Sequence, residues 1–452
     1  MFAGFFNNFH TRETVRLAWP LVITQVGHIL TGMVDNIFLG QIGPAEQAAG
    51  IFSGNLYVLL LVFTIGMSYG ATPLVTVANE NRDVRQKSSL FFNSLFLNVL
   101  VAVLCFVILF SLSPYLKYMR QPADVVLLAV PFFNVIVLSI IPLSLFFTCK
   151  QYCEGLSNTR MALFISIAGN AINIALNYIF IYGKLGIPSM GYMGAAWASF
   201  YSRLFMGLAF MVLVFRSGST NDFAAMWRVV KLNLKDLAEL WKIGINSAMQ
   251  FIFEVAAFVF AGLMAGSFGK EQIDSHGIAL NLAAFTYMFG SGISSASTIR
   301  AGIFMARNDW EGIRNASLAS IKLVMLVMGS FGVLFLLFND HLPVIFSAHA
   351  GIIHLASQLL LIAAMFQLFD GLQVTVIGIL RGLEDVKVPT LITLIGYWVI
   401  ALPLAYFLAF TLKMETFGIW IALLVSLVFV ATCALWRLRV LIRRHTSASV
   451  HP

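Results

Sequence analysis

The sequence predicts an all-α integral membrane protein of twelve transmembrane helices, arranged as two pseudo-symmetric six-helix bundles. Three observations lead to this fold class. Only 11% of the 452 residues are charged and 60% are apolar, against about 25% and about 45–50% in soluble domains. The apolar residues gather in stretches of about 20, which is the length that crosses a ~30 Å hydrocarbon core. The two halves of the chain also repeat each other.

The predicted crossings follow one another with short loops, so little sequence is left for a soluble domain. The first lies behind Arg12, Glu13 and Arg16 and lacks a small-residue cleavage site, so we expect it to stay in the protein. The twelve stretches cover residues 15–39, 51–77, 90–112, 125–148, 161–182, 193–215, 243–263, 278–305, 318–338, 352–378, 388–411 and 417–436.

The distribution of Lys and Arg predicts the orientation. Most of the 28 Lys and Arg residues lie with the termini and the even-numbered loops, and Arg203 falls inside a span. The positive-inside rule therefore predicts that both termini are cytoplasmic, and the net charge of +8 reflects topology and not nucleic-acid binding. The odd-numbered loops, on the other side of the membrane, hold only Lys117, Arg120, Lys184, Lys270 and Lys413.

An internal repeat divides the chain. Residues of the first half recur in the second half 226 or 227 positions later, in corresponding loops and spans. This repeat indicates duplication of a six-helix unit. We expect an N-terminal bundle over 1–215, a cytoplasmic linker over 216–242 and a C-terminal bundle over 243–452. The matched residues include Gly40 with Gly266, Gly43 with Gly269, Gly66 with Gly292, Thr72 with Thr298, Asp83 with Asp309, and Glu154-Gly155-Leu156 with Arg381-Gly382-Leu383.

Two bundles related by an axis along the membrane normal suit alternating access, in which the halves rock about a site near the midplane. A channel is disfavoured because no repeated filter loop is present in the sequence. An enzyme is also disfavoured, since the sequence holds no phosphate loop, nucleophile elbow or paired carboxylates at a soluble cleft. The architecture therefore predicts a transporter.

Three carboxylic acids inside the spans are the candidate ion-coupling residues: Asp35, Glu254 and Asp370. Placing a charged side chain at the bilayer centre costs at least ~2.5–3.5 kcal/mol of free energy, so we take each such residue as a candidate functional residue. The spans offer almost no Lys or Arg as partners. A carboxyl group in apolar surroundings can take up and release protons, and it can equally bind a hard cation with neighbouring oxygens. Sodium at Glu254 and Asp370 therefore remains an alternative to protons.

Amide side chains accompany these acids. Asn173 and Asn177 share one helical face and form a polar N-half site with Asp35 if their spans are adjacent; the alternative is hydrogen bonding between helices. Gln250 precedes Glu254 by one turn. Gln367 and Gln373 flank Asp370 at spacings of three, in a stripe that must face protein or water. We take these three glutamines as candidate polar residues of a substrate cleft.

Other singled-out residues favour packing or substrate contact. His28 and His276 each stand alone, and we interpret them as structural residues, with proton shuttling as the alternative. Arg203 is interpreted as a snorkelling or packing residue and not as a ligand. The 41 Phe and 18 Met residues permit an adaptable apolar cleft around a carboxylate. Such a cleft suits flat organic cations through stacking and cation–π contact.

The sequence resembles the multidrug and toxic compound extrusion (MATE) family over nearly its whole length, most closely the NorM-like branch. The resemblance lies in Met33-Val-Asp35 with Gly40-Gln-Ile-Gly43, the loop from Asn173 to Pro188, the span around Glu254, and the run from Asp370 to Pro389. It implies that Glu254 and Asp370 form the C-half cation or proton site and that Asp35 is the N-half acid. Two departures are Phe366, where some sodium-binding relatives have tyrosine, and Ser199, where threonine is common.

The resemblance implies a secondary antiporter of the cytoplasmic (inner) membrane. It would export amphipathic organic cations in exchange for inward protons or sodium ions, as a monomer without a cofactor. The alternative is a flippase or exporter of lipid-linked oligosaccharides or other polar metabolites from the same superfamily. Such flippases generally have more cations in the cleft, and Arg203 is the only mid-span cation of this sequence.

Overall fold

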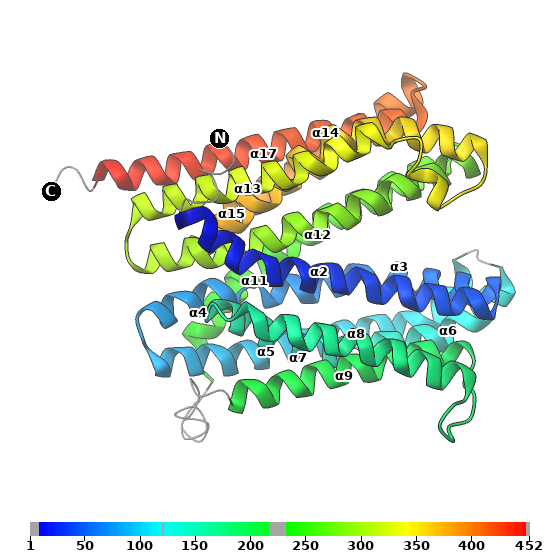
Figure 1. The fold of residues 1–452 in the computed structure, drawn as a ribbon, viewed down its shortest axis with the longest axis horizontal. Helices are drawn as coiled ribbons and strands as arrows, with labels where there is room; N and C mark the ends of the chain where they lie inside the picture. Colours follow the sequence, from blue (N-terminus) through cyan, green and yellow to red (C-terminus); the bar gives the residue numbers. More distant parts are fainter. Residues whose placement is uncertain (1–8, 120–121, 217–231, 449–452) are drawn as a thin grey trace. The chain divides into compact units, whose positions relative to one another are not determined.

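The computed structural model describes residues 9–119, 122–216 and 232–448, and every regular element within these ranges is helical. Figure 1 shows the helices in chain order. Of the predicted linker over 216–242, residues 217–231 lie outside the described ranges. The described part of the chain divides into two compact units: unit 2 spans Val26–Ala248, and unit 1 combines Met1–Gln25 with Met249–Pro452.

Unit 2 holds the first half of the repeat. In this unit α8 packs on α9, α7 on α9, α3 on α6 and α5 on α7. Its elements are most of α2 (Phe9–Ile42), α3 (Pro44–Ser68), α4 (Ala71–Glu80), α5 (Val84–Leu112), the 3₁₀ helix Ser113–Tyr118, α6 (Ala123–Leu138), α7 (Ile140–Gly155), α8 (Thr159–Tyr182), α9 (Tyr192–Arg216) and the start of α11 (Leu234–Gly266).

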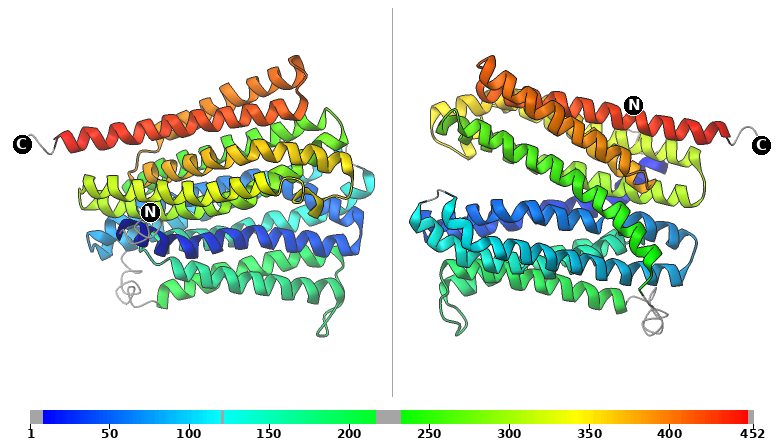
Figure 2. Two further views of the ribbon diagram at one scale, coloured as in Figure 1. Left: turned by 45° about the horizontal axis from the view of Figure 1, so that its top comes forward. Right: turned by 180° about the vertical axis from the view of Figure 1, so that it is seen from behind.

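Unit 1 holds the second half. In this unit α14 packs against α12, α13 and α17 (Figures 1 and 2). Its elements are the start of α2, the rest of α11, α12 (Lys270–Ala306), α13 (Trp310–Leu337), the 3₁₀ turn Pro343–Ile345, α14 (Ala350–Gly382), α15 (Lys387–Leu394), a π-helical turn Ile395–Ala401, α16 (Leu402–Tyr406), a second π-helical turn Phe407–Thr411, and α17 (Glu415–Ala448).

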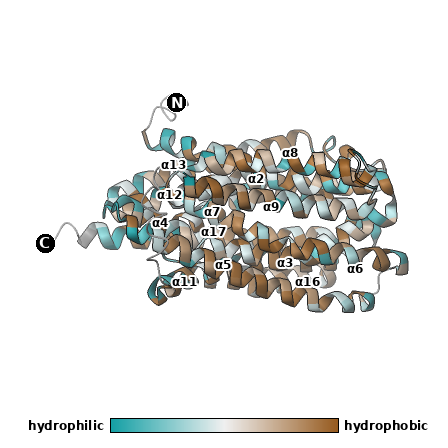
Figure 3. Ribbon diagram, turned by 90° about the horizontal axis from the view of Figure 1, so that it is seen from below, coloured by the Kyte–Doolittle hydropathy of each residue, from teal (hydrophilic) through white to brown (hydrophobic). Residues whose placement is uncertain are grey.

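Eleven spans of the described chain are long and apolar enough to cross a membrane. The predicted span 278–305 lies in α12, which is 37 residues long but carries a run of Ser, Thr and Gly from Gly290 to Gly302. That run is buried, so its polar groups face protein. Figure 3 shows apolar residues along the helices and hydrophilic ones toward their ends, for instance at the end of α17. The chain is a multi-pass membrane protein.

The repeat expected from the sequence recurs in local structure. Asp83 accepts a hydrogen bond from Gln86 N at 2.9 Å and caps α5, and its repeat partner Asp309 accepts one from Gly312 N at 2.7 Å and caps α13. The preceding residues, Arg82 and Asn308, have positive φ angles of 55° and 53°. The same aspartate at the same place satisfies the first free N–H groups of both helices.

The boundary between the two units falls inside α2, between Gln25 and Val26, and inside α11, between Ala248 and Met249. Two glycines of the repeat permit close helix contacts, one within each unit. A Cβ atom on Gly66 would clash with the backbone of Ala248 in unit 2, and one on Gly292 would clash with Val22 in unit 1. Only glycine lets the helix backbones approach this closely.

Close packing of α14 on α12 positions the helix that carries Asp370. Cβ atoms on Gly378 and Gly382 would clash with Ser294 and Thr298 of α12. Thr298 Oγ1 donates to the Gly378 carbonyl at 2.8 Å, and Ser294 Oγ donates to the Val374 carbonyl at 2.6 Å. Small residues and hydroxyl groups are the usual means of joining helices in a membrane.

Candidate functional site

Glu254 of α11 and Asp370 of α14 come together in unit 1. Asp370 is buried and Glu254 is half-buried. Phe258, one turn after Glu254, packs against Phe366, one turn before Asp370, with ring centroids 6.1 Å apart. Among the described residues, neither carboxyl group has a Lys or Arg in ion-pair distance. Two acids without a counter-charge in a mostly apolar core form a site that requires a proton or an external cation.

The walls of this site are aromatic. Phe366, one turn before Asp370, packs against Phe258 with ring centroids 6.1 Å apart and against Trp420 at 5.6 Å. All three rings belong to the main hydrophobic cluster of unit 1. Phe366 therefore contributes no oxygen ligand at the position where, by the family resemblance, some sodium-binding relatives have tyrosine.

Tyr397 brings a hydroxyl group to the acids instead. It lies in the π-helical turn Ile395–Ala401 and is fully buried. Gln373 Nε2 donates to the Tyr397 hydroxyl at 3.1 Å, and the hydroxyl donates to Gln373 Oε1 at 3.2 Å. The Tyr397 ring centroid lies 6.1 Å from that of Phe258, which follows Glu254 by one turn of α11. No signal in the sequence singles out Tyr397, because hydrophobic periodicity does not reveal a π-helical turn, a local irregularity that recurs at functional sites.

The three glutamines proposed for a substrate cleft are buried and hydrogen-bonded within unit 1. Gln250 Nε2 donates to Thr390 Oγ1 at 2.9 Å, and Gln367 Oε1 accepts from Thr286 Oγ1 at 2.7 Å. Gln373 bonds Tyr397 as described above. In this structure they connect neighbouring helices around the acids, and their contact with substrate stays a prediction.

Unit 2 holds a second, different acid site. Asp35 Oδ1 accepts hydrogen bonds from Asn177 Nδ2 at 2.8 Å and from Asn173 Nδ2 at 3.3 Å. Asp35 Oδ2 accepts from the hydroxyl of Ser199 on α9. The structure thus brings together the three residues that the sequence analysis assigned to the N-half, and it adds Ser199. Three donors stabilise the carboxylate, unlike at Glu254 and Asp370.

A short polar ladder aligns α2 with α8 before Asp35. Asn170 Nδ2 donates to the Gly27 carbonyl at 3.0 Å and its Oδ1 accepts from Thr31 Oγ1 at 2.6 Å. Gly27, Thr31 and Asp35 are one turn apart on the same face of α2. A Cβ atom on Gly27 would press against the Asn170 amide. The ladder fixes the register of the two helices that form the Asp35 site.

Arg203 lies near this site without binding Asp35. It donates to the hydroxyl groups of Ser139 and, at 3.1 Å, Tyr57, and its guanidinium stands 5.4 Å from the Tyr57 ring centroid. His28 packs against the rings of Phe146 and Phe147 at 5.6 and 5.5 Å. The contacts of both residues fit the packing roles expected from the sequence.

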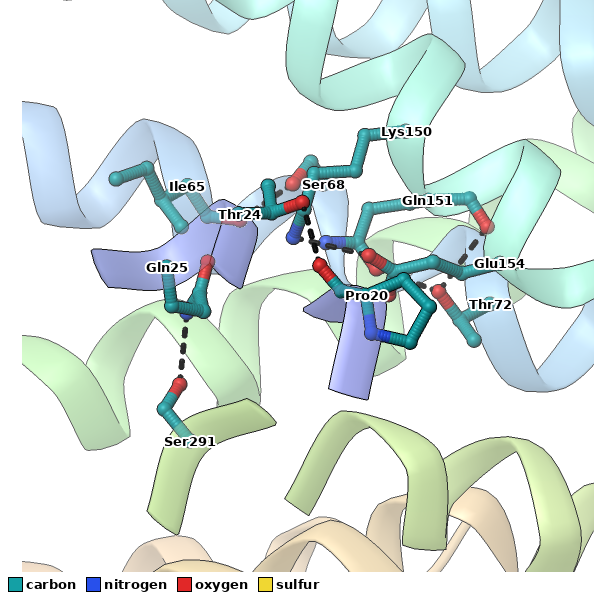
Figure 4. A network of polar contacts seen from close by, with 10 residues as sticks. All are labelled: Pro20, Thr24, Gln25, Ile65, Ser68, Thr72, Lys150, Gln151, Glu154 and Ser291. Carbon is teal, nitrogen blue, oxygen red and sulfur yellow. Dashed lines mark hydrogen bonds and ion pairs between the residues drawn. The ribbon is translucent and has the colours of Figure 1, made fainter. Parts of the chain in front are cut away.

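A buried ion pair lies at the end of α7 in unit 2. Lys150 Nζ stands 2.9 Å from Glu154 Oε1, and each side chain is 1% exposed. Beside it, Thr72 Oγ1 donates to Gln151 Oε1 at 2.6 Å (Figure 4). The pair is closed to solvent, and it joins one turn of a helix rather than two helices.

Comparison with known proteins points to one family. The sequence model of the MatE family matches residues 20–179 and 247–407, once in each half of the repeat. The chain is 29% identical to the probable multidrug resistance protein NorM of Pseudomonas putida, over 95% of both chains. It is 30% identical to the multidrug resistance protein MdtK of Yersinia pseudotuberculosis, over 96% of both.

Solved structures share the fold. A crystal structure of MATE in the bent conformation matches with a TM-score of 0.88 at 18% identity, over 99% of this chain and 98% of that one. The eukaryotic MATE transporter AtDTX14 matches with a TM-score of 0.88 at 16% identity, over 98% of this chain and 99% of that one. These matches confirm the predicted all-α, MATE-like fold.

Proposed function

Because the chain belongs to the MatE family, we propose that it is a secondary active antiporter that exports amphipathic organic cations in exchange for an inward coupling ion. Its relatives NorM and MdtK are named multidrug resistance proteins, which supports a broad range of small-molecule substrates. The chain is a transporter and not an enzyme. It would work as a monomer in the cytoplasmic membrane, with both termini on the cytoplasmic side.

One observation carries this proposal: Glu254 and Asp370 meet in unit 1 without a cationic partner among the described residues. A buried and a half-buried carboxylate inside the membrane-spanning helices cannot both stay ionised at low cost unless a positive charge joins them. A coupling ion and an organic cation both supply that charge. Binding of one therefore opposes binding of the other, and this reciprocal coupling is what an antiporter requires.

The donor set at the acids favours protons over sodium. A hard cation needs several oxygen ligands to replace its water. The site offers two carboxyl groups and the Tyr397 hydroxyl, which is already bonded to Gln373, while Phe366 contributes no oxygen. A proton needs only one acceptor. Asp35 differs from the two acids of unit 1, because Asn173, Asn177 and Ser199 donate hydrogen bonds to its carboxylate oxygens. We therefore assign Asp35 the role of attracting cations to the N-half.

The experiment that tests the coupling ion uses proteoliposomes loaded with ethidium. Outward transport is driven in one set by a proton gradient and in another by a sodium gradient, each without the other. We expect the proton gradient alone to drive export. Export driven by sodium alone would show that the oxygen atoms around Glu254 and Asp370 suffice to bind sodium. Export driven by neither gradient would contradict the antiport mechanism.

A further inference from the structure

Helix α17 is longer than a membrane crossing requires, and its surplus lies at the C-terminal end. Its 34 residues span about 50 Å, whereas the hydrocarbon core is ~30 Å thick. The apolar stretch begins at the start of the helix and ends at Trp436. Residues 437–448 therefore extend about 18 Å beyond the core, through the depth of the lipid headgroups. Figure 3 shows that this end of α17 is hydrophilic.

One face of this end is fixed to unit 1. Leu438 is buried in a hydrophobic cluster with residues of α14. Arg437 Nε donates to Asp385 Oδ2 at 2.6 Å, in the loop after α14. The His445 ring stacks on Trp310 at the start of α13, with ring centroids 4.0 Å apart. These contacts hold the helix in place beyond its membrane-spanning stretch and determine which face turns outward.

The outward face presents an aromatic ring followed by arginines. Trp436 is 66% exposed, and the exposed Arg439 and Arg443 follow it at spacings of three and seven, so the three side chains share one face of the helix. Arg444, next to Arg443, is also exposed. Within residues 9–119, 122–216 and 232–448, none of these three arginines has an acid in ion-pair distance.

The acids of the neighbouring elements leave this face with an excess of positive charge. Asp309 caps α13 and Asp385 is paired with Arg437. Glu311 is exposed at the start of α13 and, in the described part of the chain, forms no ion pair with the outward arginines. The helix dipole and the positive-inside rule both favour cations at this end. Neither explains why Arg439 and Arg443 share the face of Trp436.

The headgroup of an anionic lipid fits this arrangement. Tryptophan is enriched at the membrane–water interface, where its ring lies at the level of the headgroups. Arg439 lies one turn beyond Trp436 and Arg443 two turns. Side chains of a helix lean toward its N-terminus, so both arginines lean back toward the membrane. A guanidinium group binds a phosphate through paired hydrogen bonds as well as by charge.

We propose that Trp436, Arg439 and Arg443 form a binding site for the headgroup of an anionic phospholipid, and that Arg444 adds to its positive field. The site is separate from the proposed transport mechanism and does not depend on it. Each Lys or Arg at a membrane surface favours anionic lipid by about fivefold. Phosphatidylglycerol should therefore be preferred over phosphatidylcholine beside Trp436 by at least about tenfold.

The test uses Trp436 as a local reporter. The full-length protein is reconstituted in phosphatidylcholine vesicles that contain increasing mole fractions of phosphatidylglycerol or phosphatidylcholine with brominated acyl chains, which quench tryptophan fluorescence on contact. The signal of Trp436 is obtained by subtracting the signal of Trp436→Phe, made in each variant. We expect brominated phosphatidylglycerol to quench Trp436 at about a tenfold lower mole fraction than brominated phosphatidylcholine.

Arg439→Gln combined with Arg443→Gln should abolish this preference, whereas Arg439→Lys combined with Arg443→Lys should retain most of it, because the charges are kept. Arg85→Gln combined with Arg160→Gln is the matched control, since it removes two exposed arginines from α5 and α8 of unit 2, and should leave the preference unchanged. Equal quenching by the two lipids in the wild type would overturn the proposal without any variant. A preference that survives Arg439→Gln with Arg443→Gln would also overturn it, and so would an equal loss in the control, which would assign the preference to net charge alone.

Discussion

Asn177 of α8 donates a hydrogen bond to Asp35 of α2 at 2.8 Å, so the acid of unit 2 is tied to a second helix. Asn177 is buried, and the same amide also donates to the Asn173 carbonyl at 3.0 Å. This arrangement makes the acid of unit 2 part of the fold, whereas Glu254 and Asp370 in unit 1 hold no such amide donors. The stabilities of the two sites should therefore respond differently to substitution.

Asn177→Leu should destabilise the protein, because it leaves the half-buried Asp35 carboxylate with one donor fewer. Loss of a hydrogen bond to a charged group costs about 1.5–3 kcal/mol. We expect the apparent melting temperature in detergent, measured by fluorescence-detected size exclusion, to fall by several degrees. Asn36→Leu, an exposed position beside Asp35, should leave it nearly unchanged. Equal melting temperatures for both variants would count against the structural role of Asn177.

Gly382→Ala should weaken the packing of α14 on α12. Its Cβ atom would clash with the Thr298 carbonyl oxygen, and overpacking of a tight contact typically costs about 1–3 kcal/mol. Gly277→Ala is the matched control, since no heavy atom lies within 4 Å of its Cβ position in α12. Alanine stabilises a helix over glycine by roughly 0.5–1 kcal/mol. Thermal unfolding should therefore move down for Gly382→Ala and slightly up for Gly277→Ala.

The buried ion pair of α7 should show strong non-additivity. Removing one partner of such a pair costs about 3–5 kcal/mol, because the remaining charge stays buried alone. Lys150→Met or Glu154→Leu should each lower the yield of folded protein sharply. The double variant Lys150→Met with Glu154→Leu should recover much of the loss, since hydrophobic replacement of both partners is often neutral. A double variant as poor as the sum of the two single ones would contradict this account.

The acids could be singled out from the sequence because carboxylic acids are rare in apolar spans, and their role in ion coupling stays a prediction. Asp35 with Asn173 and Asn177 could be grouped since a spacing of four places two amides on one helical face. The repeat matched Asp83 with Asp309, and the structure shows that both residues cap helices. These features depend on local spacing, which a sequence displays directly.

Tyr397 could not be singled out in this way. A tyrosine in a span usually packs or lies at the interface, and its approach to Glu254 depends on a π-helical turn that periodicity does not reveal. The partners of Arg203 were also hidden, because Tyr57 and Ser139 lie far from it in sequence. Contacts of this kind depend on how helices pack, and hydrophobic pattern determines which segments cross the membrane but not which faces meet.

The most direct test of the proposed coupling is efflux by Glu254→Gln and Asp370→Asn in proteoliposomes under a proton gradient. Each substitution keeps the shape of the side chain and removes its charge. We expect efflux of ethidium to fall by at least about tenfold in both variants, the factor that corresponds to about 1.4 kcal/mol, while each elutes as folded protein and inserts in the membrane. Wild-type efflux by both variants would contradict the central claim that these two acids couple transport to the ion gradient.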